Sequence, residues 1–162
     1  MKVVAFNGSP RMDGNTTILI HHVFRELEKE GVETELVPPD ATLEIFDLEG
    51  IPPFNQDLET QPPGKVREFK AKIKAADALL IVTPEYNYSI PGVLKNAIDS
   101  ASRPHGNNAF EGKPVAIMGA SIGMLGTARA QYHLRQTRTK FPINLHWRQR
   151  YLKILLTFRR TL

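Results

Sequence analysis

Residues 78–92 read ALLIVTPEYNYSIPG, and this stretch indicates the fold class of the chain. Residues 78–83 are apolar up to the closing threonine, which is typical of a strand buried on both faces. The segment PEYNYSIPG that follows combines prolines, tyrosines, an acid and an amide, whereas a simple connection needs only polar residues and a turn. Residues 91–102 then have helical spacing, with Pro91 in the first turn. The stretch therefore predicts a strand, an unusual loop and a helix, which together form the repeating unit of an α/β protein.

The same alternation continues on both sides of this stretch. Strands are predicted at residues 2–7, 33–37, 113–119 and 141–145, and helices at residues 15–30, 64–76 and 125–139. Residues 40–63, which are rich in proline and acidic residues, are interpreted as a long irregular segment. Such alternation predicts a parallel sheet covered on both faces, and right-handed crossovers bring every strand-to-helix loop to one edge of it. Because there is no repeat and no clear linker, residues 1–162 are predicted to form a single domain.

The composition is that of an ordinary globular chain and excludes several kinds of site. Hydrophobic residues make up 41% and charged residues 23% of the 162 positions, which is enough for a substantial core. No cysteine occurs, so disulfides, thiolate metal sites and a thiol nucleophile are ruled out. The apolar runs are too short for a membrane span or a signal peptide, and we expect a cytoplasmic protein with no membrane partner. The histidines lack ligand spacing, so no metal site is predicted.

The basic excess is confined to one end of the chain. The net charge is +4 at pH 7, but residues 146–162 hold five Lys or Arg and no acid, which leaves 16 basic and 17 acidic residues elsewhere. The body is therefore near neutral and has no basic patch interleaved with aromatics, so no nucleic-acid partner is expected. Apolar residues of this atypical tail recur at helical spacing, which favours a packed terminal helix; a truncated or frame-shifted end is the alternative.

Residues 8–17, GSPRMDGNTT, have the composition of a phosphate-binding loop. Glycines allow tight turns, hydroxyl and amide side chains can donate hydrogen bonds, and Arg11 adds a cation beside a helix N-terminus. The alternative is a polar entry loop with a helix cap, because Asn15 or Thr16 would cap well. The motifs for nucleoside triphosphates and for dinucleotides are both missing, so a single phosphomonoester is the predicted ligand.

Two further loops are predicted at the same edge of the sheet. In residues 84–92 the prolines add stiffness, while Tyr86 and Tyr88 offer faces for stacking and Asn87 offers hydrogen bonds. Residues 119–129, GASIGMLGTAR, are glycine-rich and let the backbone approach a ligand closely. For residues 84–92 the alternative is a rigid turn whose tyrosines pack on the next helix or on a partner chain. For residues 119–129 the alternative is a flexible turn with close helix–sheet packing. A phosphate cradle, an aromatic platform and a glycine-rich wall together suit flavin mononucleotide (FMN).

Three motifs resemble those of the NADPH-dependent FMN reductase family, over residues 1 to about 140. They are GSPRMDGNTT at 8–17, TPEYNYSIPGVLKNAIDSASRP at 83–104 and GASIGMLGTARAQYHLRQ at 119–136. The resemblance implies a three-layer flavodoxin-like α/β fold whose five-stranded parallel sheet has the order 2-1-3-4-5. It also implies noncovalent FMN, NADPH or NADH as hydride donor, quinone, chromate or azo acceptors, and a homodimer or homotetramer. The similarity ends near residue 141.

The resemblance also implies which residues contact FMN. The phosphate is assigned to Ser9, Arg11, Asn15, Thr16 and Thr17; the isoalloxazine ring to Pro84, Glu85, Tyr86 and Asn87; and the pyrimidine edge of the ring to Ser121 and Gly123. No side chain is assigned a catalytic role, because the flavin carries the chemistry of such an oxidoreductase. Two alternatives stay open: a flavodoxin-like FMN electron carrier and a flavin-binding protein without activity.

Overall fold

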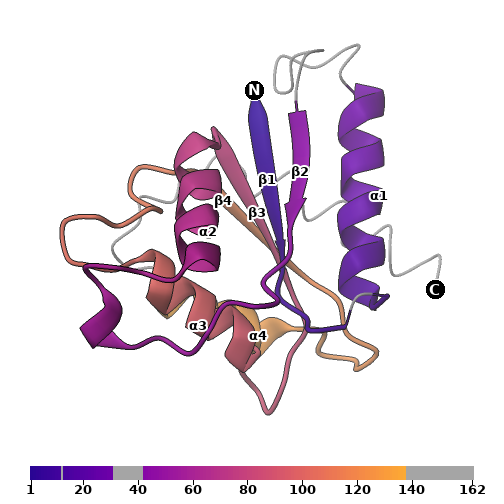
Figure 1. Cartoon of the computed structure of the whole chain (residues 1–162). Helices are drawn as coiled ribbons and strands as arrows, with labels where there is room; N and C mark the ends of the chain where they lie inside the picture. The colour runs from indigo at the N-terminus through magenta and orange to yellow at the C-terminus, as the bar shows by residue number, and fades with distance from the viewer. Residues whose placement is uncertain (12, 31–41, 138–162) are drawn as a thin grey trace.

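Four parallel strands form the centre of the molecule in a computed structural model that describes residues 1–11, 13–30 and 42–137 (Figure 1). The strands are β1 (Lys2–Asn7), β2 (Thr42–Phe46), β3 (Ala78–Thr83) and β4 (Val115–Gly119), in the order β2-β1-β3-β4. The register places Val4 between Glu44 and Leu79, with Ala116 beside Leu80 on the far side of β3. The predicted flavodoxin-like order is therefore confirmed over these four strands. The strands predicted at 33–37 and 141–145, and the basic tail, lie outside the described residues.

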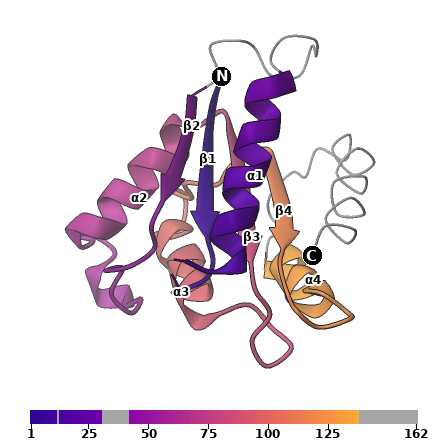
Figure 2. The same ribbon diagram turned by 90° about the vertical axis from the view of Figure 1, so that its right-hand side faces the viewer.

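Helices cover both faces of this sheet. They are α1 (Asn15–Glu30), α2 (Gly64–Ala75), α3 (Gly92–Ala101) and α4 (Ala128–Thr137), with a short 3-10 helix, η1 (Gln56–Leu58). Figure 1 shows α1 on one side of the sheet and α2, α3 and α4 on the other. Figure 2, turned so that α1 faces the viewer, shows this helix lying over the central strands. The three-layer arrangement confirms the architecture that the alternating pattern predicts.

The core is built from the apolar stripes of the helices and the two faces of the strands. On the α2 side, the ring of Phe69 lies 5.0 Å from those of Phe6 and Phe46 and 6.4 Å from that of Phe110, measured between centroids. On the α1 side, four buried residues of the helix pack against the other face of β1 and β3: Leu19, Ile20, Val23 and Phe24. Burying one such side chain stabilises the fold by about 1.5–3 kcal/mol, so both faces of the sheet contribute to the core.

Strand β2 corrects the prediction that residues 40–63 are irregular throughout. Residues 42–46 pair with β1 at the edge of the sheet, and only the segment after them is irregular apart from η1. Glu44 is tolerated in this strand because its carboxylate oxygens lie 2.5 Å from Lys72 Nζ and 3.0 Å from Lys2 Nζ. Hydrogen bonds from Lys72, which has the larger effect, and from Lys2 hold the pKa of Glu44 below its ordinary value. A five-residue strand with a central acid, set among prolines, is too short for its pattern to stand out.

Helix α4 also begins later than predicted, at Ala128 instead of residue 125. Gly126 has a positive φ of 61°, a conformation that glycine adopts at little cost, and this turn delays the start of the helix. The loop between β4 and α4 is therefore longer than the pattern indicates. In the described part of the chain, no helix combines the length and apolar character needed to cross a membrane.

Candidate functional site

Three loops lie together at the edge of the sheet where the parallel strands end. The first loop (residues 8–14) follows β1, the central loop (residues 84–91) follows β3, and the glycine-rich loop (residues 120–127) follows β4. The amide of Gly8 donates to Val82 O at 2.8 Å, and the amide of Ala120 donates to Thr83 O at 3.4 Å. The end of β3 thus joins the central loop to both neighbours. The prediction that these loops share one edge is confirmed, and ligands of open α/β sheets bind at this edge.

The first loop is organised by Asn7, a residue that the sequence analysis did not single out. Asn7 Oδ1 accepts the amide of Ser9 at 3.1 Å, and Asn7 Nδ2 donates to Thr17 Oγ1 at 3.1 Å. Ser9 Oγ in turn accepts the amide of Arg11 at 3.1 Å. The sequence signal that could have identified Asn7 is a polar residue at the end of an otherwise apolar strand. Asn7 therefore ties the loop to the first turn of α1 through hydrogen bonds within the protein.

Gly8 allows this loop to rest directly on its neighbours. A Cβ atom at this position would lie 2.9 Å from Leu94 Cδ2 and 3.0 Å from Val82 O, closer than side chains normally approach. Any larger residue would push the loop away from β3 and α3. The glycine thus holds the first loop against the end of β3.

Thr16, in the first turn of α1, is the most informative of the predicted phosphate residues. Thr16 is 2% exposed, and its Oγ1 atom has no hydrogen-bond partner among the residues that the structure describes. A buried polar atom left unpaired costs about 1–3 kcal/mol, so this hydroxyl is suited to a ligand. The first turn of a helix also presents backbone N–H groups that have no intrahelical partner, and α1 has no acidic residue there. An anion at this helix end would be complementary to both features.

The other predicted phosphate residues surround this helix end. Asn15 is exposed at the first position of α1, and Arg11 is exposed in the loop before it. Within the described residues, the guanidinium of Arg11 makes no ion pair, whereas Thr17 Oγ1 is already bonded to Asn7. The donor set therefore fits a phosphate group: Arg11 and Asn15 are exposed, Thr16 is buried with its hydroxyl unused by the described residues, and Ser9 and Thr17 are partly engaged within the protein.

The central loop is a tight two-residue turn. Tyr86 and Ser89 exchange two backbone hydrogen bonds of 2.9 Å, and between them Asn87 and Tyr88 have positive φ angles of 48° and 63°. Asparagine tolerates this conformation, but for tyrosine it costs roughly 1–3 kcal/mol, so the surroundings must hold the turn. The turn leaves the side chains of residues 86–88 exposed, as a ligand platform requires. Pro84, at its start, is half-buried and its carbonyl accepts the hydroxyl of Thr83 at 2.8 Å.

Glu85 connects the central loop to helix α4. Its Oε2 atom accepts the backbone amides of Arg129 at 2.9 Å and Ala130 at 3.0 Å. The guanidinium of Arg129 lies 4.2 Å from the ring centroid of Tyr88, and its Nη1 atom lies 3.9 Å from Glu85 Oε1. The sequence analysis missed Arg129, because an arginine on a predicted helix resembles ordinary surface charge. The carboxylate that the resemblance assigns to the ring environment is thus engaged by α4.

The glycine-rich loop is shaped by its own polar groups. Ser121 Oγ accepts the amide of Gly123 at 3.0 Å, and the carbonyl of Gly123 accepts the amide of Gly126 at 3.0 Å. Ser121 and Gly123 are both exposed, so both are accessible to a ligand. A Cβ on Gly119 would lie 1.7 Å from the hydroxyl of Thr127, so the start of α4 packs against β4 where only glycine fits.

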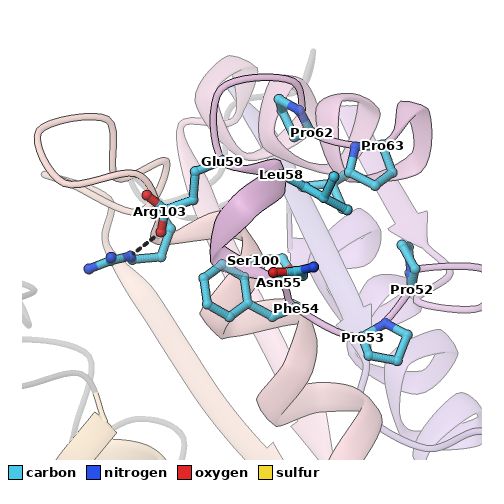
Figure 3. A pocket seen from close by; sticks show the side chains of 11 residues that line it. Pro52, Pro53, Phe54, Asn55, Leu58, Glu59, Pro62, Pro63, Ser100 and Arg103 are labelled. Carbon is cyan, nitrogen blue, oxygen red and sulfur yellow. Dashed lines mark hydrogen bonds and ion pairs between the residues drawn. The ribbon is translucent and has the colours of Figure 1, made fainter.

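One cavity borders this region, and a smaller pocket lies beside α3. A cavity of about 490 Å³ borders Ser9 and Pro10 of the first loop, residues 47–51, and Gly92 and Val93 at the start of α3. Its volume is in the range of small-molecule sites, and Ser9 is the one predicted site residue in its described lining. The pocket of Figure 3, between residues 52–66 and α3, holds about 30 Å³ and could admit little more than water. At its edge Arg103 Nε donates to Glu59 Oε1 at 2.7 Å. No group of three or more metal-ligating side chains occurs among the described residues.

Comparison with known proteins relates this arrangement to flavoenzymes. An NAD(P)H-dependent FMN reductase from Pseudomonas aeruginosa is 60% identical over 103 residues, covering 63% of this chain and 55% of that protein. A 2-hydroxy-1,4-benzoquinone reductase from a Burkholderia species is 45% identical over 135 residues, covering 83% of this chain and 68% of that protein. The chain thus spans little more than half the length of the first relative and about two thirds of the second.

A solved structure and a family profile agree with these relatives. FerB of Paracoccus denitrificans, a flavoenzyme NAD(P)H:(acceptor) oxidoreductase, superposes with a TM-score of 0.66 at 38% identity, covering 84% of this chain and 69% of that one. The profile of NADPH-dependent FMN reductases matches residues 1–143, which include every described strand and helix and all three loops. The chain therefore belongs to the NADPH-dependent FMN reductase family.

Proposed function

We propose that this chain binds FMN noncovalently and acts as an NAD(P)H-dependent oxidoreductase that reduces small-molecule acceptors. The observation that supports it most directly is the buried hydroxyl of Thr16 at the N-terminus of α1, which has no partner within residues 1–11, 13–30 and 42–137. This atom lies on the same edge of the sheet as a stiff, tyrosine-bearing turn and a glycine-rich loop. One end of that arrangement suits a phosphate and the other suits a planar ring, which are the two ends of FMN.

In this proposal, residues around the start of α1 hold the phosphate. Arg11 supplies a charge-assisted hydrogen bond, and Thr16 gains the partner that it lacks. Ser9, Asn15 and Thr17 add polar contacts, and Asn7 keeps the loop in shape through its two bonds to the loop and helix. Because hydrogen bonds within the protein hold the loop in this shape, we expect little ordering on binding, which favours affinity.

The central and glycine-rich loops hold the ring. Pro84, Glu85, Tyr86 and Asn87 border one part of it, and Ser121 and Gly123 border the pyrimidine edge. When bound, FMN supplies the acceptance of hydride from a nicotinamide and its transfer onward. The protein orients the two rings and limits water, so no side chain is assigned as acid, base or nucleophile.

The donor and acceptor are proposed as classes. NADPH or NADH serves as donor, and quinone, chromate or azo compounds serve as acceptors; the names of the relatives support the quinone class most directly. We place the reaction in the cytoplasm, where the reduced nicotinamides are available, and we propose that the chain acts as a homodimer or homotetramer.

The decisive experiment uses the purified protein loaded with FMN. NADPH and a quinone are added, and loss of NADPH is followed by absorbance, with NADH in a parallel reaction. We expect steady NADPH consumption that depends on both FMN and the quinone. If the FMN-loaded protein consumes neither NADPH nor NADH, the oxidoreductase is excluded, and a flavodoxin-like electron carrier or an inactive flavin-binding protein remains. Folded protein that stays colourless after exposure to excess FMN and desalting would exclude the flavin site itself.

A further inference from the structure

Glu85 is placed where it can control the geometry of two loops at once. Its side chain is 12% exposed, and Oε2 accepts the amides of Arg129 and Ala130, the second and third residues of α4. These N–H groups belong to the first turn of the helix and have no partner within it. One carboxylate oxygen of the central loop therefore accepts hydrogen bonds from two backbone amides of α4, whose residues are buried or half-buried.

The charge of Glu85 also matches its position. Helix α4 has no acidic residue in its first turn, so its partial positive charge is not balanced from within the helix. Glu85 supplies the missing negative charge from 44 positions earlier in the chain. Arg129, which donates its amide to Glu85, also places its guanidinium 4.2 Å from the ring of Tyr88, and this forms a second connection between α4 and the central loop.

These contacts hold a turn that would not persist by itself. Asn87 and Tyr88, both at positive φ, come directly after Glu85 and Tyr86, and the two hydrogen bonds between Tyr86 and Ser89 close the turn. A tyrosine in this conformation needs surrounding contacts that outweigh its strain. Helix α4 supplies such contacts, through the amides that Glu85 accepts and through the Arg129 side chain stacked on Tyr88.

We propose that Glu85 is a positioning residue, whose carboxylate fixes the central loop to the N-terminus of α4 and thereby sets where Tyr86 and Asn87 meet the flavin ring. This inference rests on the proposed function, because it concerns how the ring is held. Glu85 acts through the backbone of α4 and through the shape of the turn, and its carboxylate does not touch the reacting atoms. The central loop and the start of α4 then form one unit before the ligand binds.

The chain offers a matched control for this role. Glu59 also has a mostly buried side chain, 14% exposed, and it also pairs with an arginine, accepting Arg103 Nε at 2.7 Å. This pair lies at the small pocket of Figure 3, whose described lining includes no residue of the three loops. A general effect of losing a partly buried carboxylate would appear in Glu59→Gln as well, whereas a positioning effect would appear only at Glu85.

The test compares the wild-type chain with Glu85→Gln, Glu85→Ala and Glu59→Gln. FMN is titrated into each apo-protein, and affinity is followed by quenching of flavin fluorescence. The visible circular dichroism of bound FMN reports the surroundings of the ring. We expect FMN affinity to fall about 3-fold to 10-fold in Glu85→Gln and more in Glu85→Ala, with an altered dichroism spectrum. Glu59→Gln should match the wild type in both measurements, even if its stability falls.

Hydrogen exchange of the apo-proteins gives a readout that needs no flavin. The amides of Arg129 and Ala130 should exchange faster in Glu85→Gln than in Glu59→Gln. The inference would be overturned if Glu85→Gln matched the wild type in FMN affinity, dichroism and amide exchange. It would also be overturned if this variant lost stability while its FMN affinity and dichroism stayed unchanged. If Glu85→Ala does not fold, Glu85→Gln decides the question alone. A wild-type chain that binds no FMN would instead overturn the proposed function, and with it the role toward the ring.

Discussion

Helices α1 and α4 both begin at the edge of the sheet where the strands end, and neither has an acidic residue in its first turn. The first turn of α4 is nevertheless neutralised, because the carboxylate of Glu85 accepts two of its amides. The first turn of α1 instead contains a buried hydroxyl, that of Thr16, with no partner in the described part of the chain. The same electrostatic feature therefore serves the fold at α4, whereas at α1 it is left for a ligand.

This difference shows how to separate a structural helix end from a binding one. A helix N-terminus attracts negative charge wherever it occurs. The informative observation is whether the protein supplies that charge itself, as at α4, or leaves donors unpaired, as at α1. Substitutions at the start of α1 should therefore act mainly on FMN affinity, whereas substitutions at the start of α4 should act on stability and, through the central loop, on FMN affinity as well.

The largest effect is expected from Gly119→Ala, which would break the packing that seats α4. The new Cβ would lie 1.7 Å from the hydroxyl of Thr127, a side chain that is 3% exposed, so Thr127 and the start of α4 must shift. We expect the free energy of unfolding to fall by about 3 kcal/mol, measured by chemical denaturation. Gly92→Ala is the control, because its Cβ would meet no atom within 4 Å and α3 should tolerate it. Equal stability of the two variants would contradict this account.

The next largest effect is expected from Arg11→Ala, beside the start of α1, where the FMN phosphate is proposed to bind. Arg11 is exposed and makes no ion pair among the described residues, so stability should be unchanged. Loss of a charge-assisted hydrogen bond to the phosphate should weaken FMN binding by about 1.5–3 kcal/mol. Arg135→Ala, an exposed arginine in the last turn of α4, controls for the change in net charge. Unchanged FMN affinity in a titration would remove Arg11 from the phosphate site.

A smaller effect, but with a distinctive sign, is expected from Thr16→Val. Valine keeps the shape of threonine and removes the unpartnered hydroxyl, so the apo-protein should gain about 1 kcal/mol of stability. FMN affinity should fall by about 1 kcal/mol, because the ligand loses one hydrogen bond. Chemical denaturation of the apo-protein measures the expected gain in stability, and FMN titration measures the expected loss of affinity. If apo-stability falls as well, the hydroxyl has an internal role and does not await a ligand.

The smallest effect is expected from Glu44→Gln, a carboxylate paired with lysines far from either helix end. Lys72 and Lys2 lower the pKa of Glu44 in the folded chain, so the pair contributes stability above the unfolded pKa and loses it as pH falls through the folded pKa. The variant should therefore lose a few tenths of a kcal/mol at neutral pH and match the wild type in strong acid. Denaturation across this pH range, at low and high salt, measures the difference. A loss that persists in strong acid would indicate a packing effect.

Much of the fold was predictable because it follows from local patterns. The apolar run of residues 78–83, the helical spacing of α1 and α2, and the glycine and proline residues at their ends are all visible along the chain. Strand β2 was not predicted, because its central Glu44 is stabilised by Lys2 and Lys72, which lie far from it in the chain. The family was also predictable, since long motifs in the three loops carry it, and the profile match confirms that prediction.

The amino-acid sequence by itself determined the alternation of strands and helices, the shared edge of the three loops and the family, because these depend on periodicity and on residues that lie near each other in the chain. Only the tertiary structure decided that Glu85 accepts the first amides of α4, that Arg129 stacks on Tyr88, and that the Thr16 hydroxyl finds no partner among the described residues. The physical reason is distance along the chain. Which donor meets which acceptor across more than 40 positions depends on how helices pack on the sheet, and no local pattern records that geometry.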